Sequence, residues 1–242
     1  MRSVPHPGFT LVVVAALSCC GTPSPKPRAP EATGQIEGTV HLAGGELPSE
    51  TQVHNTTDPD VCGTEHTLED LVVSPENRGI RYAIVAVRGL SLEVIPPYQA
   101  EPVVLDNVGC RFSPHASVIT VGSTVEAVNS DPVLHTTHLY GPADVNISLP
   151  VKGARGTRRL EKPGTYVIKC DIHGWMQAFV RVDPHPYHSV TDESGGFRID
   201  GIPVGTYTLE VWHEKLGSRE TEVRVEEGTT VSVLVEYTWT EN

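Results

Sequence analysis

The segment CDIHGWM, residues 170–176, places three side chains that bind soft metal ions close together. Cys170 offers a thiolate, His173 an imidazole and Met176 a thioether. A thiolate, an imidazole and a weak thioether suit copper in a trigonal site with a long axial bond. Such a site also needs a second histidine from elsewhere in the chain.

That second histidine is available in the segment NSDPVLHTTHLY, residues 129–140. His135 and His138 are three positions apart, so in an extended strand they point to opposite faces and one of them can face a metal. We expect His135 to bind and His138 to lie at the surface.

Other chemistry fits these residues less well. Zinc rarely recruits a methionine, and thiol redox chemistry needs a second cysteine that the sequence CDIH lacks. No Ser-His-Asp order, paired-acid motif or phosphate loop is apparent. We therefore do not expect a hydrolase. His115 and His213 are the other histidines to examine for a second metal site.

Short strands bounded by turn residues fill the chain from Gly34 onward. Side chains alternate between polar and apolar along most of them, and helical periodicity is nearly absent, a pattern typical of an all-β fold made of sandwiches. The clearest strands are predicted at residues 35–42, 80–87, 164–170 and 176–182. Two more are predicted within 117–129, on either side of Gly122, and four within 196–237.

The segments around the candidate ligands resemble a cupredoxin, the Greek-key sandwich of plastocyanin and amicyanin. CRFSPHASVITVGSTVEAVNSDPVLHTTH is followed by LEKPGTYVIKCDIHGWMQAFVRV, and the similarity spans residues 103–183. The C-x-x-H-x-x-M spacing is that of the short amicyanin-type loop. The resemblance implies one type 1 copper ion bound by His135, Cys170, His173 and Met176, the last as axial ligand. It also implies that His173 lies nearest to solvent as the port for electrons.

Three residues beside these ligands raise further questions. Thr136 stands where the family usually has asparagine, and one hydroxyl makes fewer hydrogen bonds than an amide. Asp171 follows the cysteine, where a buried carboxylate would oppose thiolate formation. Trp175 is expected either in an apolar docking patch or packed over the end of the domain.

The number of cysteines is relevant to the assignment of Cys170 as a copper ligand. Cys62, Cys110 and Cys170 remain once the two cysteines near the N-terminus are set aside. If Cys170 binds copper, Cys62 and Cys110 are free to form a disulfide.

A second resemblance is carried by SVTDESGGFRIDGIPVGTYTLEVWHEKLG, residues 189–217. It is similar to the carboxypeptidase regulatory-like, transthyretin-type β-sandwich, and GQIEGTVHLAGGELP at residues 34–48 looks like the opening strand of that family. We expect this sandwich to comprise residues 34–95 and 184–242, with the cupredoxin at 96–183 inserted. The alternative is two sequential domains that meet near Pro184.

The N-terminus predicts export. Residues 1–19 have one arginine and an apolar run that ends at Cys19 and Cys20, which resembles a lipoprotein signal peptide. We expect acylation of Cys19, with Cys20 as the alternative. Residues 20–33 are rich in proline and read as a stiff tether.

Together these features predict an exported blue-copper protein that carries single electrons in the periplasm or cell envelope, lipid-anchored to a membrane. The expected partner is a redox protein such as a c-type cytochrome or a periplasmic oxidoreductase. The net charge of −12 argues against nucleic-acid binding. The alternatives are a copper carrier or sensor, and a cell-surface binding module without redox turnover.

Labelled palmitate tests the predicted anchor. We expect label in the exported protein and its loss when Cys19 is replaced by serine, because the acyl chain attaches to that sulfur. Label that persists in Cys19→Ser and disappears in Cys20→Ser would favour the alternative, and no label in the wild type would refute lipidation.

Overall fold

The computed structural model describes residues 32–95 and 98–239. The predicted signal peptide, both candidate lipidation cysteines and nearly all of the predicted tether lie outside these residues. Within them, strands dominate and helix is limited to α1 (Pro59–Cys62) and the short 3-10 turn η1 (Leu92–Val94). The predicted all-β fold class is confirmed. None of the described helices has the length and apolar character needed to span a membrane.

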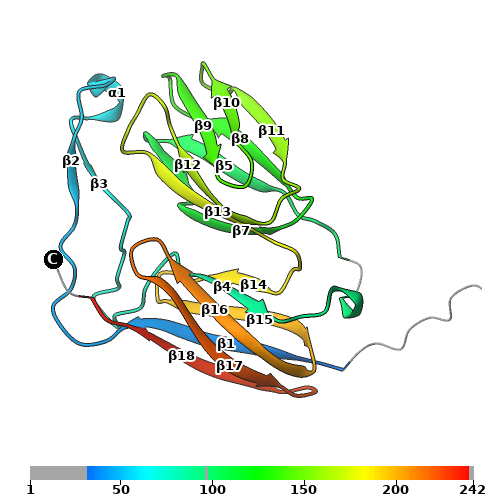
Figure 1. Ribbon diagram of the computed structural model, residues 1–242. Coiled ribbons are helices and arrows are strands. Elements are labelled where there is room, and N and C mark those ends of the chain that lie inside the picture. The colour runs from blue at the N-terminus through cyan, green and yellow to red at the C-terminus, as the bar shows by residue number, and fades with distance from the viewer. Residues whose placement is uncertain (1–31, 96–97, 240–242) are drawn as a thin grey trace, which may run out of the picture. The chain divides into compact units, whose positions relative to one another are not determined.

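Two sheets form a β-sandwich that we call the flanking sandwich, because its strands come from both ends of the described chain (Figure 1). One sheet has the order β15 (Gly196–Pro203), β1 (Thr33–Leu42), β18 (Thr230–Tyr237). The other has the order β14 (His188–Val190), β4 (Ile84–Arg88), β16 (Gly205–His213), β17 (Gly217–Val225).

The chain between β4 and β14 forms two more sheets, which we call the central sandwich. The first has the order β10 (Val145–Leu149), β9 (His135–Tyr140), β12 (Gly164–Lys169), β13 (Gln177–Asp183), β7 (Ala116–Thr120). The second has the order β11 (Arg155–Arg159), β8 (Thr124–Asn129), β5 (Val103–Val108), β6 (Arg111–Ser113). The exact domain boundaries expected near residues 95 and 184 stay predictions.

Each sandwich has its own hydrophobic core. Strand β1 shows how alternation builds the flanking core, since Ile36, Val40 and Leu42 are buried in it together with residues of β4, β16 and β18. Gly38 allows β1 to pack closely, because a Cβ there would lie 2.3 Å from the carbonyl oxygen of Val233. The central core gathers apolar residues from β5 to β13, with Tyr166 and Ile168 fully buried.

Two regions differ from the sequence prediction. The strand expected at residues 80–87 begins at Ile84, because Tyr82 adopts a left-handed backbone conformation with φ of 66° and the chain turns there. The second region was not predicted at all. It is a hairpin of β2 (Gln52–His54) and β3 (Glu65–Thr67) with α1 at its tip, and we call residues 52–67 the strap.

A partly buried ion cluster joins the two sandwiches. Arg88 of β4 donates to Asp183 at 2.7 Å and to Glu210 of β16 at 2.6 Å, and Arg181 of β13 donates to Glu210 at 3.0 Å. Burial opposes ionisation of Asp183, but His188, whose Nδ1 lies 3.5 Å from Oδ2, and the hydrogen bond from Arg88 outweigh it and hold the pKa of Asp183 far below its usual value. The attraction between these opposite charges offsets the cost of removing them from water where the two sandwiches meet.

His213, at the end of β16, gives the flanking sandwich a pH dependence. Burial, reinforced by nearby His115, lowers the pKa of His213 to about 4, while Asp70 opposes the shift. The folded state thus resists protonation that the unfolded chain accepts near pH 6.5. The stability from neutral His213 is present above pH 6.5 and is lost as the pH falls toward 4.

We therefore predict that His213→Leu flattens the pH dependence of unfolding. The free energy of unfolding of the wild type should fall by up to about 3 kcal/mol between pH 6.5 and 4 from this group, and that part should disappear in the variant. Urea unfolding at several pH values measures it. His54→Gln, at an exposed histidine, is the control. An unchanged slope in His213→Leu would contradict the assignment.

Candidate metal centre

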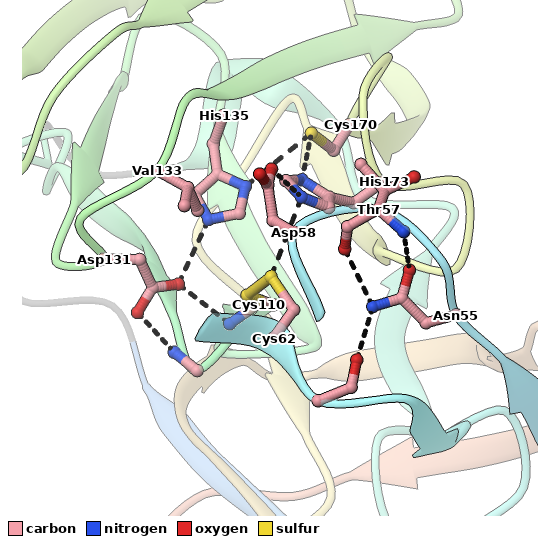
Figure 2. The surroundings of a disulfide bond; sticks show 12 residues. Asn55, Thr57, Asp58, Cys62, Cys110, Asp131, Val133, His135, Cys170 and His173 are labelled. Atoms are coloured by element: carbon pink, nitrogen blue, oxygen red, sulfur yellow. Dashed lines mark hydrogen bonds and ion pairs between the residues drawn. A yellow bond between two sulfur atoms is a disulfide. The ribbon is translucent and has the colours of Figure 1, made fainter. Parts of the chain in front are cut away.

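Three of the predicted ligands meet at one end of the central sandwich. The Sγ of Cys170 lies 3.8 Å from Nδ1 of His135 and 3.6 Å from Nδ1 of His173 (Figure 2). All three side chains are buried, and their potential ligand atoms lie within 4.8 Å of one another. The structure therefore brings together two imidazole nitrogens and one thiol from two distant segments.

Strand pairing explains this meeting. Strands β9 and β12 are antiparallel neighbours, with Lys169 opposite His138. Cys170 follows the end of β12 directly, so its side chain comes near the beginning of β9, where His135 lies. The backbone then turns, and the N–H of Met176 donates to the carbonyl of His173 at 3.0 Å. This tight turn returns the chain into β13.

The donor set fits a soft metal ion. Cys170 is the one cysteine of the described residues outside a disulfide. Burial would raise the pKa of its thiol, but hydrogen bonds from His135 and from the backbone N–H groups around it lower that pKa to about 6. One thiolate and two imidazoles in an apolar pocket are a typical set for copper. Met176 is buried in the same hydrophobic cluster as Cys170 and stays a predicted axial ligand.

A second group of close donors includes Cys110, Asp131 and His135. The sulfur of Cys110 is bonded to Cys62 in a disulfide, so it is not available as a thiolate. Asp131 instead fixes the orientation of His135. Its Oδ2 lies 3.1 Å from Nε2 of His135, and its two oxygens accept the backbone N–H groups of Gly109 and Cys110. A hydrogen bond to the remote nitrogen of a ligating histidine selects its tautomer.

Thr136 braces the cysteine loop although it is not an asparagine. Its Oγ1 accepts the N–H of Asp171 at 2.8 Å, and its own N–H donates to Cys170 Sγ at 3.4 Å. The hydroxyl also lies 3.9 Å from that sulfur. One residue thus links β9 to both the thiol and the loop after it.

Asp171 lies on the outer face of the sheet, away from the thiol. Its carboxylate pairs with Nδ1 of His138 at 3.0 Å and accepts from Tyr140 and Asn146. The side chain is partly exposed, so its charge is solvated and does not oppose thiolate formation from a buried position. His138 lies in the same surface cluster and not at the metal centre.

The prediction that His173 is the ligand nearest to solvent is wrong. His173 has an exposed fraction of 0 % because the strap covers it. Its Nε2 lies 3.1 Å from Oδ2 of Asp58 and 3.7 Å from Sγ of Cys62 (Figure 2). The strap belongs to the chain between β1 and β4, far from the ligands in sequence. The residues of the cysteine loop therefore could not indicate that another segment covers His173.

Trp175 does not form an exposed apolar patch. Its ring stacks on His66 of the strap with centroids 4.3 Å apart, and its Nε1 donates to the carbonyl of Cys110 at 3.0 Å. The expected alternative, packing over the end of the domain, describes its position.

The disulfide joins Cys62 of α1 to Cys110 in the turn between β5 and β6. It therefore connects the strap to the central sandwich. His115 and His213 do not join any cluster of close metal-binding side chains in the described part of the chain. His115 instead contacts Glu214, next to His213.

Comparison with protein families finds a match over one part of the chain. The family model of the carboxypeptidase regulatory-like domain matches residues 175–238. This stretch includes β13 of the central sandwich as well as β14–β18 of the flanking sandwich. Comparison with curated proteins gives no match.

The solved structures that resemble part of the chain include several copper proteins. A copper-containing nitrite reductase from Thermus scotoductus SA-01 is 30% identical with a TM-score of 0.32, and the match covers 40% of this chain and 25% of that one. An amicyanin variant in its Cu(I) form is 17% identical with a TM-score of 0.30, and the match covers 41% of this chain and 98% of the amicyanin. A purple cupredoxin from Nitrosopumilus maritimus is 24% identical with a TM-score of 0.29, and the match covers 34% of this chain and 99% of the cupredoxin. The chain thus spans about a quarter of the nitrite reductase.

The brace formed by Thr136 generates a prediction. Thr136→Val keeps the shape of the side chain but leaves the N–H of Asp171 without its acceptor, so the free energy of unfolding should fall by about 1 to 2 kcal/mol. Thr136→Ser keeps the hydroxyl and should stay nearer to the wild type. Urea unfolding of the metal-free protein measures both. A valine variant as stable as the wild type would show that the hydroxyl is not needed.

Proposed function

We propose that this protein binds one copper ion in a type 1 site and carries single electrons. The observation that carries the proposal is the convergence of Cys170 Sγ with Nδ1 of His135 and of His173 in a buried pocket. Copper, when bound, supplies one-electron redox chemistry, and the thiolate provides strong electronic coupling to the protein.

The residues of the chain hold this site in a fixed arrangement. Asp131 orients His135, and the N–H and hydroxyl of Thr136 contact the sulfur. Asp58 contacts the remote nitrogen of His173. Ligands held by such surrounding contacts move little, which favours fast electron transfer.

The burial of all three donors favours electron transport over the alternative of a copper carrier or sensor. A carrier must hand its metal to another protein, which requires access to the ligands. Here His135 and His173 both have an exposed fraction of 0 %. The proposal also holds that the protein is not an enzyme by itself.

We further propose an exported, lipid-anchored protein of the periplasm or cell envelope. The disulfide between Cys62 and Cys110 supports an oxidising compartment. The net charge of −12 supports a redox partner with a basic docking face, such as a c-type cytochrome or a periplasmic oxidoreductase.

The visible spectrum of the copper-loaded protein tests the proposed site. We predict uptake of one cupric ion and an intense thiolate-to-copper band that Cys170→Ser abolishes, because the band requires the sulfur. His138→Gln is the matched control, since that histidine lies in β9 but faces away, and its band should persist. Absence of cupric uptake, or a band retained in Cys170→Ser, would contradict the proposal.

A further inference from the structure

The strap reaches from the flanking sandwich to the metal centre of the central sandwich. Its strands β2 and β3 pair with Val53 opposite His66, and α1 lies at its tip (Figure 1). It belongs to the segment that connects β1 to β4. The flanking sandwich therefore contributes a structural part to a site whose predicted ligands all lie in the other sandwich.

Hydrogen bonds of Asn55 give the strap tip a defined shape. The Asn55 side chain accepts the N–H of Thr57 at 2.7 Å and donates to the carbonyls of Thr57 and Gly63. The backbone N–H of Asn55 donates to the carbonyl of Thr64. Asp58 follows in a left-handed conformation with φ of 48°, just before α1.

Two contacts fasten the strap to the central sandwich independently of Asp58. One is the disulfide from Cys62 to Cys110, and both of these residues are buried. The other is the stack of His66 on Trp175. A tip that is shaped internally and held at two points does not depend on a bound metal for its position.

The contact of Asp58 with His173 has a specific geometry. The carboxylate oxygen lies 3.1 Å from Nε2, and Nδ1 of the same ring lies 3.6 Å from Cys170 Sγ. An acceptor at Nε2 places the ring proton there and leaves the lone pair of Nδ1 directed at the thiol. The Asp58 side chain is 42 % exposed whereas His173 is fully buried.

We infer that the strap is a fixed cover of the metal centre and that Asp58 is a positioning residue for His173. External molecules then meet the strap tip and not the ring edge of His173. The role of Asp58 toward a metal ligand rests on the proposed function, whereas the cover is a property of the protein without metal.

Reactivity of Cys170 in the metal-free protein tests the cover. Iodoacetamide is added to the full chain without reductant, and alkylation of the peptide that contains Cys170 is followed by mass spectrometry. We expect the double variant Cys62→Ser, Cys110→Ser to react faster by about tenfold or more, because the strap opens locally once it is unfastened. Asp60→Asn, an exposed position in α1, should react like the wild type.

Equal rates in the wild type and the double variant would overturn the cover. Such a result would mean that the reagent reaches the thiol without passing the strap. The place to look for that path is a pocket of about 510 Å³, lined in part by Asn55 of the strap and by Trp175 and Met176. If circular dichroism shows that the double variant does not fold, Asn55→Ala replaces it, because it removes the bonds that shape the tip. Cys170 should then be alkylated about tenfold faster or more in Asn55→Ala than in the wild type, and equal rates would overturn the cover.

Two substitutions of Asp58 test its positioning role. Asp58→Asn keeps an oxygen acceptor, and Asp58→Gly removes the acceptor while it tolerates the left-handed backbone. In the diamagnetic Cu(I) protein, NMR should show the His173 Nε2 proton in the wild type and in Asp58→Asn. In Asp58→Gly this proton should exchange with solvent faster by about tenfold or more.

An unchanged exchange rate in Asp58→Gly would overturn the positioning role. The two experiments separate the possible failures. If copper does not bind, the alkylation result still decides whether the strap covers Cys170. If copper binds and alkylation is insensitive to the strap, the proposed function stands and the cover is refuted.

Discussion

The metal centre depends on the antiparallel pairing of β9 with β12. Three paired positions, from Val167 opposite Tyr140 to Lys169 opposite His138, set the register. A shift of one residue would turn His135 to the outer face and His138 inward, because side chains alternate along a strand. The N–H of Thr136 donates to Cys170 Sγ, and the Thr136 hydroxyl accepts the N–H of Asp171; both bonds strengthen this register at the point where the ligands meet.

The strap adds a constraint of a different kind. In the cupredoxin arrangement expected from the sequence, the histidine of the cysteine loop is the ligand that faces solvent. Here the strap covers that histidine, and its residues Asp58, Cys62 and His66 all contact residues at this end of the central sandwich. The two sandwiches are therefore structurally interdependent, with the partly buried cluster of Arg88, Asp183 and Glu210 as a further junction.

The sequence predicted what is encoded locally. The all-β class follows from alternation, as in β1, and the position of Cys170 after a strand follows from the segment GTYVIKC. The strap was missed because β2 and β3 have only three residues each and show no periodicity. The burial of His173 was missed because it depends on a contact with Asp58, 115 residues earlier. The outward orientation of Asp171 also depends on residues outside its own segment, because its carboxylate bonds to His138 and Asn146.

The disulfide has a consequence for the chain as a polymer. Cys62 and Cys110 are separated by 48 positions, and their bond closes a covalent ring that contains β3, β4 and all of β5. In the chain-entropy view, a ring of this size lowers the entropy of the unfolded chain enough to stabilise the fold by about 4 kcal/mol. A single peptide-bond cut inside the ring would leave both products joined through sulfur, so the covalent link between the strap and the central sandwich would survive a proteolytic nick.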